Sequence, residues 1–342
     1  MRYFVAVITI VILMGIPVNS FSSAKTNKYF SLYGGIWNID NGEASFKISF
    51  PITGVGTGYS ELEWEGLDSL APMIGAKIVP YFYFLTLDIQ YAGGNLREGD
   101  NTDTDWVGGY LPFSISKADT DGDVKHWSID LNILLYPYRG KPTSWGRGER
   151  DKGDGETIFE AIDRKKRGWA DDRTKLKAII GYFNYEYRLR DTNGVQTSDP
   201  LGIFGGTGPF PGLNSTFDFQ WKGIKTGLSF EHDFIQSPSK GLHAFGFNIE
   251  YAYLWKIDYT GKGYWNLRDL SFTQEADNGT GYDFLIYLFY NPFRNFQVQL
   301  GYRSLHVEAK NGLDLRSGVK NADLDKAESS SAGWLLNLAY TF

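Results

Sequence analysis

The chain has 342 residues, of which 40 are Gly, 24 Phe, 22 Tyr and 10 Trp, and it contains no Cys. Without Cys it cannot be a disulfide scaffold, a thiolate zinc site or an iron–sulfur protein. The formal net charge of -6 argues against general nucleic-acid binding, which needs a basic surface. The excess of aromatic residues and Gly is typical of a chain with many β-strands and turns and a surface that meets something other than water.

The first 24 residues have the pattern of a secretory signal peptide. Arg2 supplies a positive charge, the run from Tyr3 to Ile16 is apolar, and Ser22-Ser23-Ala24 offers the small residues of a cleavage site. The apolar run is short for a membrane-spanning helix, which needs about 20 residues. We therefore expect a signal peptide over 1–24, with a retained N-terminal anchor as the alternative.

Apolar residues recur at every second position along the rest of the chain. At the C-terminus Trp334, Leu336, Leu338, Tyr340 and Phe342 alternate with smaller or more polar residues. The same alternation occurs in the segments 83–91, 127–133, 179–189, 245–255 and 296–302. Because successive side chains of a strand point to opposite faces, each segment is predicted to be a strand with one apolar and one polar face.

This alternation fits two kinds of all-β protein. In a soluble sandwich the apolar face would be the core, whereas in a membrane barrel it meets lipid and Glu186, Arg188, Glu250 and Arg303 line the lumen. Two observations favour the barrel. Aromatic residues gather at strand ends, as in interfacial girdles, and the connections alternate between short and long. A last strand that ends in Phe also resembles the recognition strand of Gram-negative outer-membrane barrels.

We therefore expect an all-β fold, a ten-stranded antiparallel transmembrane β-barrel over 25–342 with both termini in the periplasm. The ten strands are expected at 29–49, 59–79, 82–94, 123–136, 176–191, 214–233, 242–259, 279–290, 296–307 and 328–342. The connections 95–122 and 192–213 are predicted to be long loops. Within 214–233 the apolar set moves from odd to even positions, which we interpret as a β-bulge near Lys222-Gly223.

The connection 137–175 is too long for a periplasmic turn and carries many charges. Within it, Glu156 to Gly168 is predicted to form a short helix that ends in the basic run 164–167. One interpretation is a contact with peptidoglycan or a periplasmic partner. The other, which we favour, is a solvated insertion without a role, because a basic run is usually an exposed face.

Several short motifs resemble those of the omptins, the ten-stranded outer-membrane aspartyl proteases of Gram-negative bacteria. Tyr59-Ser60-Glu61-Leu62-Glu63-Trp64 resembles the Ser-x-Leu-acid-Trp opening of their second strand, and Asp103-Thr104-Asp105-Trp106 resembles their Asp-x-Asp-Trp segment. Ile129-Asp130-Leu131-Asn132-Ile133 resembles their fourth strand and Ala339-Tyr340-Thr341-Phe342 their end. The motifs span the mature chain in strand order, so the chain is similar to a divergent omptin; the long 137–175 segment departs from the family.

The resemblance implies an endopeptidase site in an extracellular groove. Omptins use two acids on one wall and an Asp-x-His pair on the other, and together these position and deprotonate a water that attacks the peptide carbonyl. By resemblance, Asp103 and Asp105 are the catalytic acids. The alternative for these two residues is a turn-forming role in a loop, which is common for Asp.

The second wall departs from the omptin pattern. In the best ungapped register the family Asp falls at Lys262 and the family His at Tyr264, and Tyr is a poor base at neutral pH. His126, at the start of a predicted strand, is a candidate replacement base that could approach Asp103 or Asp105 from the rim. The alternative is that His126 is a plain polar residue of the interface.

Three functions follow as hypotheses: an omptin-type aspartic endopeptidase, an omptin-like barrel that binds or adheres without proteolysis, and, least favoured, a small channel. The expected partners are the lipid bilayer, lipopolysaccharide (implied by the omptin resemblance) and peptide or protein substrates at the groove, with no nucleic acid. No cofactor or metal is expected. The run Gly205-Gly206-Thr207-Gly208 lacks the Lys of a phosphate loop, and Asp119 to Asp123 lacks the Glu of a calcium loop.

Overall fold

The computed structural model describes residues 30–79, 84–108, 111–136, 174–202, 205–235, 244–293 and 295–342. The predicted signal peptide over 1–24 lies outside the described residues. So does almost all of the 137–175 insertion, including the helix predicted from Glu156 to Gly168. No helix among the described segments is long and apolar enough to cross a membrane.

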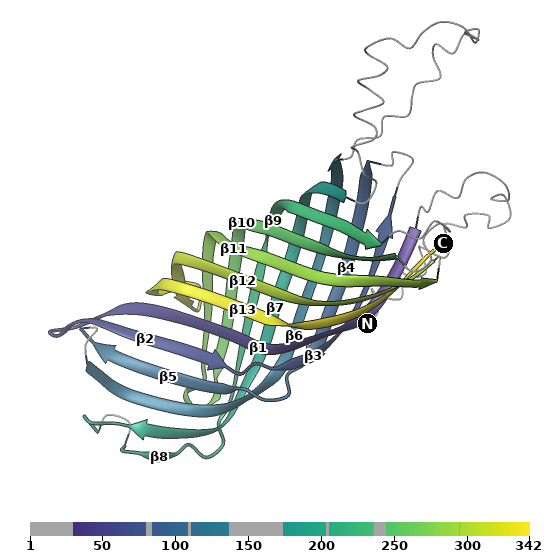
Figure 1. Ribbon diagram of the computed structural model, residues 1–342. Helices are drawn as coiled ribbons and strands as arrows, with labels where there is room; N and C mark the ends of the chain where they lie inside the picture. Colours follow the sequence, from purple (N-terminus) through teal and green to yellow (C-terminus); the bar gives the residue numbers. More distant parts are fainter. Residues whose placement is uncertain are drawn as a thin grey trace, which may run out of the picture.

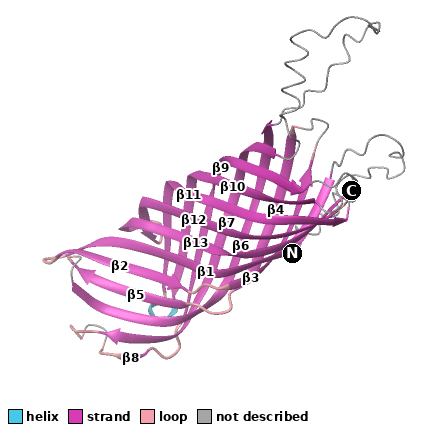
Figure 2. Cartoon of the chain, viewed as in Figure 1, coloured by secondary structure: helices cyan, strands magenta, loops and turns pink. Residues whose placement is uncertain are grey.

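The described chain forms one antiparallel sheet that closes on itself (Figures 1 and 2). Its strands are β1 (Phe30–Ile52), β2 (Gly56–Glu65), β3 (Ser69–Ile78), β4 (Leu85–Asn95), β5 (Asp100–Val107), β6 (Leu111–Tyr136), β7 (Thr174–Ser198), β8 (Gly208–Pro209), β9 (Asn214–Ile235), β10 (Ala244–Trp265), β11 (Leu270–Phe293), β12 (Phe296–Arg316) and β13 (Val319–Thr341). A 3-10 helix, η2 (Asn266–Arg268), joins β10 to β11.

Ten wall strands build this ring, as the sequence predicts. β2 and β3 are two parts of one wall strand, because both pair with β1, and β4 and β5 likewise both pair with β6. The ring closes through β1 with β13 and through β6 with β7. The short β8 only extends the edge of β7.

The two ends of the barrel are distinguishable. At the terminal end, the amide of Phe342 donates to the carbonyl of Phe30 over 2.9 Å, and their rings lie 5.7 Å apart. At the other end, which we call the hairpin end, the β1–β2 hairpin and β8 project far from the C-terminus (Figure 1). We refer to the two parts of the barrel as the membrane half, nearer the termini, and the hairpin half.

In the membrane half, apolar side chains face outward and charged ones face the lumen. Leu336 and Leu338 on β13 expose 48% and 47% of their surface, although both are aliphatic. Arg303 is buried inside, and Glu250 lines the same interior. The predicted apolar exterior and the predicted lumen positions of Glu250 and Arg303 are therefore confirmed.

In the hairpin half this polarity is reversed. On β7 the aromatic side chains of Tyr185 and Tyr187 are fully buried, whereas Arg188 on the same strand faces outward. The prediction that Glu186 and Arg188 line the lumen was therefore wrong. A period of two does not say which face points inward. Where the outer face is polar, the apolar side chains fill the interior as an ordinary hydrophobic core.

The same reversal explains the change of parity that the sequence shows in the sixth wall strand. β9 pairs with β7 without interruption through Asn184↔Lys222 and Phe183↔Gly223, so the bulge predicted near Lys222-Gly223 was wrong. Odd positions of β9 face inward throughout: Trp221 belongs to the aromatic core, and Lys225 to the charged lumen. The apolar residues change parity because the surroundings change along a continuous strand.

Both predicted long loops turn out to contain strands. The 95–122 segment holds β5 and the first part of β6, which pair with each other from Asp100↔Asp119 to Val107↔Leu111. The 192–213 segment begins with the last residues of β7, which ends at Ser198. Their Asp, Thr and Gly residues reflect a polar outer surface and not the absence of strand structure, so composition predicted loops where the sheet continues into the hairpin half.

Candidate functional site

Asp103 and Asp105 lie on β5 and face the interior of the hairpin half. They pair with Leu62 and Ser60 of β2, whose side chains are buried inside. Both acids are half-buried, and the Ser60 hydroxyl donates to Asp103 Oδ1 over 3.4 Å. Asp103 and Asp105 thus lie on one face of β5, as the sequence predicts.

The surroundings of the acids disfavour their ionised form. Burial raises the pKa of Asp103 to about 8, and the neighbouring Asp105 carboxylate adds to that shift. Burial also raises the pKa of Asp105. The Arg268 guanidinium acts in the opposite direction on the pKa of both acids. Arg268 ends η2 and lies over the Trp265 ring, 5.3 Å from its centroid.

Lys262 and Tyr264 do not face the acid pair. Both are exposed on β10, and the Tyr264 hydroxyl donates to Asp269 over 3.1 Å. The cause is a bulge at Lys256, whose φ of 48 lies in the left-handed region. There the ladder moves from Trp255↔Ile224 to Asp258↔Lys222, so the extra residue turns every later even position outward.

The inward positions beyond this bulge carry no base. Gly261 and Gly263 face the interior, and a Cβ on them would lie 2.4 Å from the Tyr259 hydroxyl and 2.1 Å from the Phe272 ring. Glycine at these two positions lets the aromatic side chains approach the backbone. The wall opposite the acids is therefore aromatic and glycine-rich where omptins place Asp and His.

His126 is far from the acids. It is buried at 2% exposure in the lumen, and its Nε2 lies 3.3 Å from the Arg303 guanidinium. The partner of Asp103 on β6 is Ser116. His126 follows ten positions along the same strand, which is roughly 33 Å at 3.3 Å per residue. The prediction that His126 lies at the rim was wrong.

Aromatic residues fill the interior of the hairpin half. The Trp64 ring centroid lies 4.9 Å from that of Phe217 and 5.1 Å from that of Phe219, and Phe46 packs 5.9 Å from Trp64. The Trp64 indole donates to Asp191 Oδ1 over 3.0 Å, so the polar edge of the ring is satisfied. Trp64 of the omptin-like motif is thus the centre of a core.

Ion pairs fill the lumen of the membrane half. Lys225 bonds Asp130 at 3.0 Å and Asp283 at 2.9 Å, and Arg303 bonds Asp283 at 2.8 Å. The Arg303 guanidinium also lies 5.2 Å from the Trp37 ring. The cavity beside this network has a volume of about 40 Å³, which is room for a water molecule or two.

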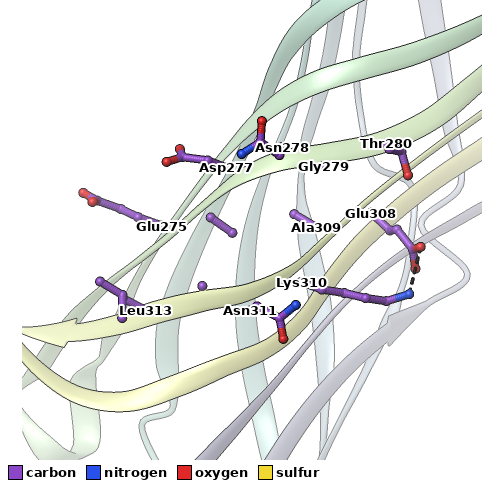
Figure 3. A pocket seen from close by; sticks show the side chains of 12 residues that line it. Glu275, Asp277, Asn278, Gly279, Thr280, Glu308, Ala309, Lys310, Asn311 and Leu313 are labelled. Carbon is purple, nitrogen blue, oxygen red and sulfur yellow. Dashed lines mark hydrogen bonds and ion pairs between the residues drawn. The ribbon is translucent and has the colours of Figure 1, made fainter.

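A second candidate site is an opening in the wall that the sequence analysis missed. β11 and β12 pair at Glu275↔Leu313 and again at Thr280↔Glu308, but not at the positions between. Asn278 and Asn311 lie there with φ of 60 and 58, in the left-handed region. The opening forms a cavity of about 580 Å³ with polar side chains on both strands (Figure 3).

Two Asn-Gly dipeptides mark this opening in the sequence. Asn278-Gly279 lies at the start of the strand expected at 279–290, and Asn311-Gly312 follows the strand expected at 296–307, although Asn-Gly normally signals a turn. In the structure the two dipeptides lie inside β11 and β12. Their occurrence on neighbouring strands at the same height could have indicated a break in the ladder.

A closed ring of ten antiparallel wall strands with an apolar outer surface defines an outer-membrane β-barrel. The family model described as "Pom: Protochlamydia outer membrane protein" matches residues 166–342, over half of the chain, and the protein belongs to this family. No curated protein sequence matches the chain.

Solved structures show which barrel this is similar to. The outer membrane protease OmpT from Escherichia coli superimposes with a TM-score of 0.63 at 12% identity, covering 94% of this chain and 100% of that one. The toluene transporter TbuX of Ralstonia pickettii gives a TM-score of 0.34 at 7% identity, covering 93% of this chain and 90% of that one. The similarity to OmpT shows an omptin-like fold, and it shows no activity.

Proposed function

We propose that the protein is a non-proteolytic outer-membrane barrel whose hairpin half projects from the cell and binds other molecules there. The wall facing Asp103 and Asp105 carries this proposal. The charge of the Arg268 guanidinium lowers the pKa of both carboxyl groups, whereas Lys262 and Tyr264 point away from them. Omptin-type hydrolysis needs a His that takes a proton from water. A guanidinium cannot take that proton, because it stays charged in proteins.

An acid-pair endopeptidase is the second candidate. Asp103 and Asp105 face the same interior surface, and the pKa of both is raised. Two close carboxyl groups can share one proton, so that one acts as acid and the other as base. This mechanism would use Asp103 and Asp105 as catalytic residues without a His.

A cleavage assay separates the two candidates. Refolded protein is incubated with a peptide library in the presence of lipopolysaccharide, the partner that the omptin resemblance implies, and products are identified by mass spectrometry. Asp103→Asn/Asp105→Asn is the test variant. Asp121→Asn/Asp123→Asn, with the same spacing on the outer face of β6, is the matched control.

We expect no cleavage above background by the wild-type protein or either variant. Cleavage by wild type and the control that is lost in Asp103→Asn/Asp105→Asn would establish the endopeptidase and end the non-proteolytic proposal.

A further inference from the structure

The opening between β11 and β12 is bounded on all sides by the barrel wall. At one end a Cβ on Gly279 would lie 2.6 Å from the Glu308 carbonyl oxygen, and at the other a Cβ on Gly312 would lie 2.3 Å from that of Glu275. The strands are therefore in contact at both ends and separate only between them. The inward residues Ala276 and Ala309 are buried and lie against the facing strand, 2.7 Å from a Cβ on Gly312 and 3.1 Å from a Cβ on Gly279.

The strands lose their mutual hydrogen bonds across this opening. Residues 276–279 of β11 have no ladder partner among 309–312 of β12. On their other sides, Ala276 and Gly279 pair with β10, and β12 pairs with β13 except at Asn311. Backbone donors and acceptors that lose a ladder partner must pair with water or with a ligand. The opening is thus a short stretch of free sheet edge inside an otherwise closed barrel, which normally has none.

The side chains around this edge are mainly acidic. Glu275 and Asp277 face outward on β11, and neither forms an ion pair within the described part of the chain. Across the opening, Glu308 pairs with Lys310 over 3.0 Å (Figure 3). Three carboxylates against one ammonium leave a negative site, which would repel lipid phosphates and attract a cation.

A metal ion fits this site poorly. No group of three or more His, Asp or Glu in the described segments is arranged to hold one. An organic cation with several donors fits better, because a guanidinium or ammonium can donate at once to carboxylates, to amide oxygens and to free backbone carbonyls. The volume of about 580 Å³ exceeds what one side chain needs and leaves room for part of the attached backbone.

We propose that this opening binds an extended peptide segment of another protein through an Arg or Lys side chain, with the peptide backbone bonding to the free edges of β11 and β12. The cation lies among Glu275, Asp277 and Glu308, and the backbone contacts follow the mode in which a strand adds to an exposed edge. This assignment rests on the proposed surface-binding function and names the site and the ligand chemistry.

Fluorescence anisotropy tests the proposal with two labelled eight-residue peptides, one alternating Arg with Thr and the other alternating Glu with Thr. Refolded protein in detergent micelles is titrated at low and at high salt. We expect the Arg peptide to bind and the Glu peptide not to bind. Glu275→Gln/Asp277→Asn should raise the Kd for the Arg peptide at least about tenfold, because it removes two charge-assisted contacts.

The matched control is Glu63→Gln/Glu65→Gln on β2, which also converts two exposed acids to amides but lies outside the opening. It should change the Kd less than about twofold. Lys310→Ala should lower the Kd, because it removes the cation that already occupies Glu308. The proposal would be overturned if the Arg peptide did not bind or if both double variants changed its Kd equally. It would also be overturned if calcium displaced the Arg peptide from Glu275 and Asp277.

Mass spectrometry of the Arg peptide after incubation separates this inference from the proposed function. An intact peptide that does not bind refutes the inference alone. A peptide whose cleavage requires Asp103 and Asp105 refutes the non-proteolytic function. Binding of the Arg peptide to the opening is then measured with Asp103→Asn/Asp105→Asn, which cannot cleave it. Each variant is first checked for heat-modifiable migration, so that a misfolded barrel is not taken for a binding defect.

Discussion

At the scale of single residues, Asp191 shows how the hairpin half handles a buried acid. Its Oδ1 accepts from the Trp64 indole at 3.0 Å and from the Thr120 hydroxyl at 2.7 Å. Burial nevertheless raises the pKa of Asp191 to about 6, and these two bonds offset only part of that effect. The folded state therefore holds this proton more tightly than the unfolded chain does.

Asp191→Asn tests the resulting pH dependence. Because the folded pKa is raised, the stability from this group is fully present below about pH 4 and is lost as the pH rises through about 6. An Asn oxygen keeps both hydrogen bonds and removes the charge. We expect Asp191→Asn to raise the urea midpoint at pH 7.5 and to reduce the change in midpoint between pH 4 and pH 7.5.

Asp191→Ala is the contrasting variant. It leaves the Trp64 and Thr120 donors buried without an acceptor, so it should lower the free energy of unfolding by about 1–3 kcal/mol at both pH values. A midpoint for Asp191→Asn that falls together with that of Asp191→Ala would show that the carboxylate charge stabilises the fold.

At the scale of elements, the bulge at Lys256 decides which side chains of β10 face the acid pair. Before it, even positions such as Asn248 and Ala252 are buried inside; after it, odd positions such as Ile257 and Tyr259 are. One extra residue thus keeps an aromatic core above a polar lumen on this strand. β9 reaches the same result without a bulge, by its choice of residues alone.

Two changes at Lys256 should have opposite outcomes. Lys256→Gly places the residue best suited to the left-handed region at a φ of 48, so we expect it to fold with unchanged or slightly higher stability. Deletion of Lys256 would turn Lys262 inward and Tyr259 outward. The variant should therefore fail to fold and should lose heat-modifiable migration in electrophoresis. A deletion variant that folds normally would show that the bulge does not set the register.

At the scale of the whole molecule, the sequence predicted the ring of ten wall strands and its apolar exterior, because period-two alternation and a terminal Phe are local signals. It did not predict the reversal of polarity in the hairpin half. Tyr185 and Leu336 have similar patterns in the sequence, yet one faces a core and the other faces outward. Which face points inward differs between the two halves of the barrel, and the position of a segment in the barrel is fixed only when the strands pair.

The candidate site was predictable to the same degree. Asp103 and Asp105 share a strand face because they are two residues apart, and this follows from the sequence. The position of His126, the outward direction of Tyr264 and the opening between β11 and β12 depend on pairing register and on residues with positive φ. Such features arise between strands, so no single segment reveals them.

The wall opposite the acid pair turns Lys262 and Tyr264 outward and holds an aromatic core inside. The chain has no Cys, so single Cys variants can be labelled without background. Refolded Lys262→Cys, Tyr264→Cys and Tyr259→Cys are treated with a charged maleimide. We predict fast labelling at 262 and 264 and protection at 259. Protection at 262 and 264 with fast labelling at 259 would instead place the first two side chains toward Asp103 and Asp105 and Tyr259 outward, the opposite of the faces described above.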